Sequence, residues 1–150
     1  MDQALVEFRT KFRVAELLVG ETASWTWSVR PAQPTLGAGI IALKRFAPRF
    51  SEVTAEEMAD LAALVSRVEQ TVGRCFRHRI MNYLMLMMVD HQVHFHALPR
   101  YDGARDFAGR RWVDAGWPAL PAFGDTQHAD SPDVLPAIQS ALRETGPGTG

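Results

Sequence analysis

The chain has 150 residues, the size of one domain, and its single cysteine, Cys75, excludes an internal disulfide framework. Sixteen lysines and arginines nearly balance 17 aspartates and glutamates, and the formal net charge of -1 favours neither nucleic acid nor a membrane surface as a partner. The sequence has no apolar window of about 18 residues and no signal-peptide core, so we expect a cytoplasmic protein. We predict a single domain over residues 1–145 and a flexible tail over 146–150.

The first 50 residues predict one helix and two strands. An apolar stripe at steps of three and four predicts a helix that ends near Gly20; its members are Leu5, Phe8, Phe12 and Ala15. Alternation over residues 25–30 predicts a half-buried strand with Trp25, Trp27 and Val29 on its inner face. After a loop with prolines and glycine, residues 39–43 read as a short buried strand.

Residues 51–72 give the clearest helical pattern. Thr54 and Glu57 have the spacing of a capping box, which satisfies two backbone N–H groups at a helix start. An apolar stripe follows at steps of three and four, and Gly73 then breaks the pattern.

Two adjacent strands are predicted next, over residues 80–89 and 92–98. The run 83–89 is entirely apolar, which indicates a strand buried on both faces. Only Asp90 and His91 separate the strands, so we predict a tight antiparallel hairpin, with Pro99 ending the second strand. A loop-rich stretch follows Tyr101, and Ser131 opens a last helix through about Leu142. These elements predict an α+β domain whose antiparallel sheet has helices on one side.

Three of the five histidines fall within residues 91–96, and His94 and His96 share one face of the predicted strand with Gln92. Imidazole can be a nucleophile, an acid or base, or a metal ligand. A backbone carbonyl that holds Nδ1–H would leave the Nε2 lone pair free for attack. A second imidazole about 7 Å further along the face is suitably placed to contact a phosphoryl group.

Three other interpretations compete with phosphoryl chemistry. His94 and His96 could bind a metal ion with His91 or Asp90 as the third ligand, although His91 is out of phase with the other two. The histidines could instead be hydrogen-bonded core residues, which is less expected for three together. The third interpretation is a nucleophilic cysteine, but Cys75 has no sequence signature of one.

The run His94-Phe95-His96-Ala97-Leu98-Pro99-Arg100-Tyr101 resembles the signature of the histidine triad (HIT) nucleotide hydrolases and transferases. In that signature three histidines alternate with apolar residues, and here Gln92 stands at the first histidine. The resemblance covers roughly residues 16–101. A further histidine that relatives carry would fall at Ala38 or a neighbour.

The resemblance implies a HIT-like antiparallel sheet of about five strands and a homodimer that needs no metal or other cofactor. It implies that His94 is the nucleophile, that His96 contacts the phosphate and leaving group, and that the backbone carbonyl of Gln92 orients His94. Asn82, Ser28 and His91 are the expected substrate-binding residues.

The expected function is therefore hydrolysis or nucleotidyl transfer at the α-phosphate of a nucleoside phosphate, through a covalent nucleotidyl-histidine. A diadenosine polyphosphate or a phosphoramidate would be a suitable substrate. Two alternatives remain open: a noncatalytic nucleotide-binding or interaction module, and a metal-binding protein that uses His91, His94 and His96.

Overall fold

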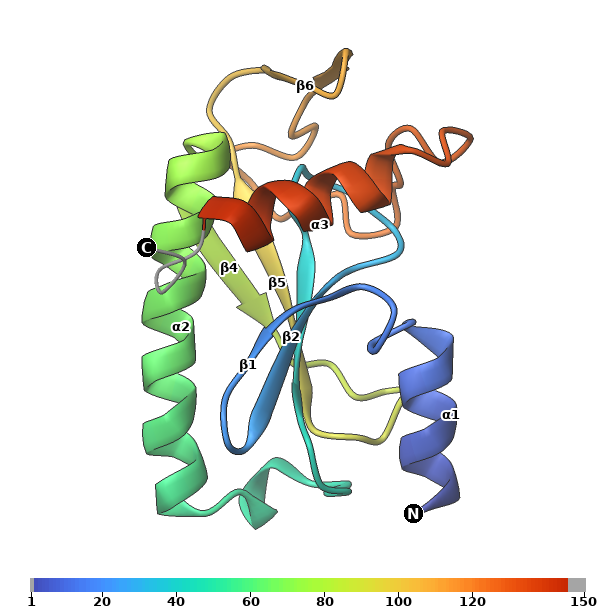
Figure 1. Cartoon of the computed structure of the whole chain (residues 1–150), viewed down its shortest axis with the longest axis vertical. Helices are drawn as coiled ribbons and strands as arrows, with labels where there is room; N and C mark the ends of the chain where they lie inside the picture. The colour runs from blue at the N-terminus through green and yellow to red at the C-terminus, as the bar shows by residue number, and fades with distance from the viewer. Residues whose placement is uncertain (1, 146–150) are drawn as a thin grey trace.

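The computed structural model describes residues 2–145 (Figure 1), so the tail expected over 146–150 lies outside the described residues. Within residues 2–145, runs of strands between three helices make an α+β fold. In chain order the elements are α1 (Gln3–Lys11), β1 (Leu18–Glu21), β2 (Trp25–Val29), β3 (Gly39–Leu43), the 3-10 turn η1 (Phe50–Glu52), α2 (Ala55–Phe76), β4 (Ile80–Leu84), β5 (His94–Arg100), β6 (Arg105–Phe107), β7 (Arg110–Trp112) and α3 (Val134–Thr145).

The main sheet has five strands in the order β1-β2-β3-β5-β4, and each neighbouring pair is antiparallel. This confirms the expected fold class. The strand that carries the histidines, β5, lies between β3 and β4, so its side chains are held from both sides. The β6–β7 hairpin is a separate two-stranded sheet within the stretch that was expected to be loop.

Helix α2 forms where the capping box predicted it. The Thr54 hydroxyl accepts from the Glu57 N–H, and the Glu57 carboxylate accepts from the Thr54 N–H. The helix does not stop at Gly73 as expected but continues to Phe76 and ends at Arg77, which has left-handed backbone angles. One glycine costs a helix only about 1 kcal/mol. Burial of Val72 and Phe76 against the core opposes that cost.

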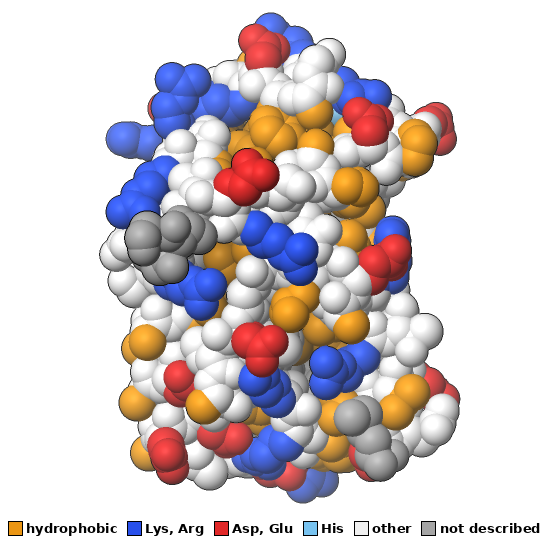
Figure 2. All heavy atoms as spheres, in the orientation of Figure 1, with side chains coloured by type: hydrophobic (Ala, Val, Ile, Leu, Met, Phe, Trp, Pro, Cys, Tyr) orange, Lys and Arg blue, Asp and Glu red, His pale blue; other side chains and the backbone are white. Residues whose placement is uncertain are grey.

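Helices α2 and α3 cover one face of the sheet and enclose the main hydrophobic core (Figure 1), in which Trp25 and Trp27 are fully buried as expected. Charges of both signs are spread over the face seen in Figure 2, in keeping with the near-zero net charge. None of the helices in residues 2–145 has the length and apolar character needed to span a bilayer.

Helix α1 packs on the opposite face (Figure 1), so the expectation of helices on one side was wrong. It ends at Lys11 rather than near Gly20, because Arg13 takes left-handed angles and the chain then turns into β1. Phe8 packs there with Ile40 and Ala42 of β3 in a second, smaller core. Of the four residues in the predicted apolar stripe, Leu5 and Phe8 are buried on α1, whereas Phe12 and Ala15 lie beyond the helix and Ala15 is exposed.

The connection between β4 and β5 also differs from the prediction. Strand β4 ends at Leu84 and β5 begins at His94, so residues 85–93 form a long loop rather than a tight hairpin. Met88 is 82% exposed, and β4 is an edge strand rather than one buried on both faces. Pro99 does not end β5, which pairs with β4 through Arg100; the pairing with β3 stops earlier, at Ala97.

Candidate functional site

His94 and His96 lie side by side on the face of β5 that α1 covers. Their ring centroids are 5.0 Å apart with the planes at 78°. Only 2% of His94 and 6% of His96 is exposed. The strand period thus places both imidazoles together, as the sequence predicted, in a setting that excludes most water.

The tautomer of His94 follows from its contact with the backbone. Its Nδ1 lies 2.6 Å from the carbonyl oxygen of Gln92, and a carbonyl can only accept. Nδ1 therefore carries the proton, and Nε2 keeps its lone pair. Burial lowers the pKa of His94, and the bond to Gln92 only partly opposes that shift. The ring is thus a neutral imidazole with the expected orientation of a nucleophile.

His96 has the opposite tautomer. The Nε–H of Arg30 donates to Nδ1 of His96 across 3.1 Å, so Nδ1 must be the acceptor and Nε2 carries the hydrogen. Burial, together with the charge of Arg30, lowers the pKa of His96 to about 3. At neutral pH the pair therefore offers a lone pair on His94 and an N–H donor on His96.

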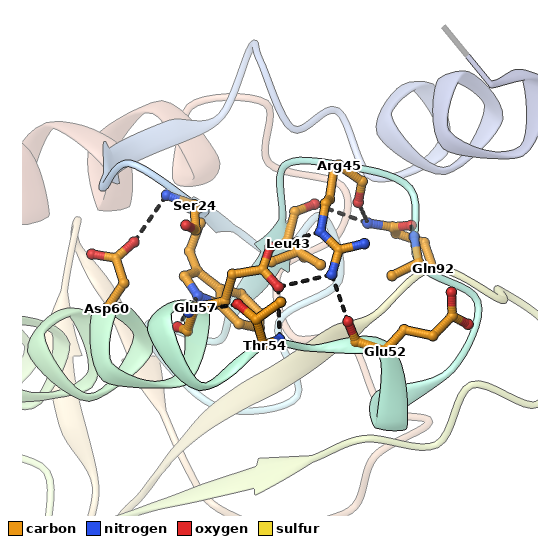
Figure 3. Close-up of polar contacts among 10 residues, drawn as sticks. Ser24, Leu43, Arg45, Glu52, Thr54, Glu57, Asp60 and Gln92 are labelled. Atoms are coloured by element: carbon orange, nitrogen blue, oxygen red, sulfur yellow. Dashed lines mark hydrogen bonds and ion pairs between the residues drawn. The ribbon is translucent and has the colours of Figure 1, made fainter.

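The side chain of Gln92 makes three hydrogen bonds to the backbone of residues 43–47. It lies ahead of β5, and its amide is buried against the backbone of the segment that follows β3 (Figure 3). Nε2 donates to the carbonyls of Leu43 (2.9 Å) and Arg45 (2.7 Å), and Oε1 accepts from the Ala47 N–H (2.9 Å). Gln92 thus contributes its own carbonyl to His94 and uses its side chain to fix this segment.

The three expected substrate-binding residues are dispersed. Ser28 is fully buried on β2 in the same cross-strand row as His96, with Ile40 between them, and its hydroxyl has no hydrogen-bond partner within residues 2–145. Asn82 lies on β4 opposite Leu98. Its side-chain oxygen, Oδ1, already accepts a hydrogen bond from Arg100 at 2.8 Å. It lines a separate open groove of about 380 Å³. His91 is exposed in the loop before β5.

A metal site at His91, His94 and His96 is not formed. In the described part of the chain no three side chains of His, Cys, Asp or Glu come together in a way that could hold a metal ion. Nδ1 of His94 is hydrogen-bonded to the Gln92 carbonyl, and Nδ1 of His96 is hydrogen-bonded to Arg30.

Aromatic rings cover both histidines. Phe8 of α1 and Phe12, the residue that follows this helix, lie 4.8 and 5.9 Å from His94 between ring centroids, and Phe123 lies 4.9 Å from His96. An ion pair of 2.9 Å joins Lys11 to Asp90 at the edge of this cover. The aromatic rings thus leave little of either imidazole exposed.

Sequence reasoning missed Arg30 and the role of the cover. Arg30 was only the polar end of a predicted strand, and the phenylalanines fitted an ordinary core stripe. A usable signal was the alternation itself, since Arg30 is two residues from Ser28 and so shares its face.

Solved structures with the same fold are histidine triad proteins. A hypothetical histidine triad nucleotide-binding protein from Sulfolobus tokodaii matches with a TM-score of 0.68 and 16% identity, over 96% of this chain and 91% of that one. Histidine triad proteins from Sinorhizobium meliloti (TM-score 0.65, 16% identity, 89% and 93% covered) and Bradyrhizobium japonicum (0.59, 20%, 89% and 93%) also match. No protein-family model and no curated protein matches the sequence. The chain therefore has the histidine triad fold.

Proposed function

We propose that the protein is a nucleotide hydrolase or nucleotidyltransferase that acts at the α-phosphate of a nucleoside phosphate through a covalent intermediate on His94. One observation carries the proposal: a buried imidazole whose Nδ1 proton is held by the Gln92 carbonyl at 2.6 Å stands next to a second imidazole of opposite tautomer. The histidine triad fold supports nucleotide chemistry of this kind.

In the first step the Nε2 lone pair of His94 attacks the α-phosphorus. A P–N bond forms, and the bond from phosphorus to the leaving group breaks with its electron pair on the leaving atom. The Nε2–H of His96 donates to the phosphoryl or leaving oxygen. In the second step the oxygen of water, or of another acceptor hydroxyl, attacks phosphorus. The P–N electrons then return to His94, and the proton of the acceptor passes to solvent.

Replacement of the first histidine by Gln92 is compatible with this reaction. The nucleophile is oriented by a main-chain carbonyl, which any residue at position 92 supplies. The glutamine amide additionally satisfies three backbone groups of residues 43–47.

Trapping of the intermediate tests the proposal. The protein would be incubated with a panel of adenylylated substrates, quenched and measured by intact mass. We expect one added nucleotidyl group in the wild type, and none in His94→Ala. His128→Ala is a matched control, because His128 lies against Trp112 rather than in the site, and it should form the adduct normally. Turnover that survives in His94→Ala would overturn the assignment of the nucleophile.

A noncatalytic nucleotide-binding module is the second candidate, and the aromatic cover over His94 and His96 favours it. Nucleotide affinity without an adduct or turnover, for every substrate of the panel, would select this alternative.

A further inference from the structure

Arg30 is a half-buried cation for which the described residues supply no carboxylate. It follows β2 directly, and its backbone N–H donates to the Ala38 carbonyl at 2.8 Å. Its Nε binds His96, and its Nη1 binds the Ala32 carbonyl at 3.2 Å. Nη2 has no hydrogen bond within residues 2–145, and none of the ion pairs there includes Arg30. A guanidinium in this position is suited to an external anion.

The flat face of the Arg30 guanidinium also packs against an aromatic ring. Its Cζ lies 4.5 Å from the ring centroid of Phe123, and the same ring makes an edge contact with His96. Ser28 of β2 lies two residues before Arg30 on the site face of the sheet, and its buried hydroxyl has no partner in the described part of the chain. Nη2 of Arg30 and the hydroxyl of Ser28 are thus donors without an acceptor in the described residues, which indicates a polar, negatively charged ligand.

The register of the sheet places Arg30 on one particular side of the two histidines. One cross-strand row contains Thr26, Ala42 and His94, and the next contains Ser28, Ile40 and His96. Arg30 follows Ser28 on the same face, one row further from His94. Along the site, the proposed nucleophile His94 therefore comes first, the N–H donor His96 second and the guanidinium of Arg30 third.

Displacement at phosphorus requires the nucleophile and the leaving group to lie roughly in line. With His94 attacking from one end, the leaving group departs toward His96 and Arg30. His96 stays neutral here, because its Nδ1 accepts from the Arg30 cation, which opposes protonation of the ring; it can donate a hydrogen bond from Nε2 but has no proton to transfer. A leaving amine needs a proton, whereas a leaving phosphate or polyphosphate departs as an anion and needs only positive charge and N–H donors.

We propose that Arg30 is the binding site for an anionic leaving group, so that the substrates are phosphoanhydrides rather than phosphoramidates. This rests on the proposed function and narrows its substrate class. The P–O bond of the anhydride breaks with its electron pair on the bridging oxygen of the leaving phosphate, and Arg30 with the Nε2–H of His96 stabilises that charge. No proton transfer is needed in this step.

The test compares two substrates in several variants. Diadenosine tetraphosphate supplies an anionic leaving group, and adenosine 5′-phosphoramidate supplies an amine. We expect Arg30→Gln to lower kcat/KM for the tetraphosphate by ~10- to 100-fold and to change kcat/KM for the phosphoramidate by less than about threefold. Arg30→Lys should recover part of the loss. Arg49→Gln removes an exposed arginine of the same charge and should leave both rates unchanged.

A binding measurement separates failure of this inference from failure of the proposed function. Inorganic pyrophosphate should raise the Tm of the wild type and of His94→Ala but not that of Arg30→Gln. Equal losses for the two substrates, without a pyrophosphate effect that depends on Arg30, would overturn the inference and leave the proposed function standing. Absence of turnover together with Arg30-dependent binding of pyrophosphate would overturn the function and leave the anion site. Absence of both would overturn both.

Discussion

The Nε–H of Arg30 and Nδ1 of His96 are 3.1 Å apart, and this contact holds a buried imidazole in its neutral form. A histidine whose pKa falls on folding stabilises the native state above its unfolded pKa of about 6.5 and loses that contribution as the pH falls toward its folded pKa. With a folded pKa of about 3, stability should decrease throughout this window on acidification.

We therefore expect the free energy of unfolding to fall between pH 7 and pH 5 by about 2 kcal/mol more in the wild type than in His96→Gln. Urea unfolding at several pH values measures this difference. Parallel pH profiles for the two proteins would show that His96 is not neutral in the folded state. Contributions of the other ionisable groups are common to both proteins and cancel in the comparison.

Gln92→Ala should destabilise the protein and leave the orientation of His94 intact. The substitution leaves the buried carbonyl of Leu43 and the N–H of Ala47 without their partners, which costs about 2–4 kcal/mol. The backbone carbonyl that accepts from His94 remains. We expect a lower urea midpoint, with the ¹⁵N shifts of the His94 ring unchanged. A changed tautomer of His94 in this variant would contradict the role assigned to the carbonyl.

Phe12→Ala should open the aromatic cover. Phe12 contacts both imidazoles, at 5.9 and 6.0 Å between centroids, and is less buried than Phe8. Its removal should increase the rate at which diethyl pyrocarbonate modifies His94, read by peptide mass. Val6→Ala is the control, since Val6 is on the exposed side of α1. An unchanged rate for Phe12→Ala would mean that α1 does not limit access.

We expect a homodimer that covers the apolar loop after β4. Leu86, Met88 and Val89 are 51%, 82% and 76% exposed, and they follow an edge strand with unpaired backbone groups on one side. Met88→Glu should shift the protein from dimer to monomer in sedimentation velocity. Val113→Glu alters an exposed apolar residue elsewhere and should remain dimeric. A monomeric wild type would refute this expectation.

The parts of the fold that the sequence predicted depend on local patterns. The capping box of Thr54 and Glu57, the alternation around Trp25 and Trp27, and the period of His94 and His96 each determine a structure within a few residues. The α+β class followed from these elements.

The parts that were missed depend on tertiary contacts. The apolar run 83–89 has the composition of a buried strand, but the sheet pairs it only as far as Leu84. Helix α1 stops early at a left-handed turn that no glycine marks. The side chain of Gln92 turns toward residues 43–47, and Arg30 reaches His96 across 66 positions of sequence. No periodicity within one segment contains such information.

A chain of contacts links the start of α2 to His94, and Figure 3 shows its first two contacts, as far as Gln92. The Glu57 carboxylate accepts from Arg45, the Arg45 carbonyl accepts from the Gln92 amide, and the Gln92 carbonyl accepts from His94. Gln92 and the segment after β3 lie beyond the row of His94, whereas Arg30 lies beyond the row of His96. Under the proposed function, the residues that orient Nε2 of His94 are thus distinct from those expected to meet the ligand, so substitutions at Arg30, Phe12 or Phe123 should change substrate preference while the geometry of attack stays the same.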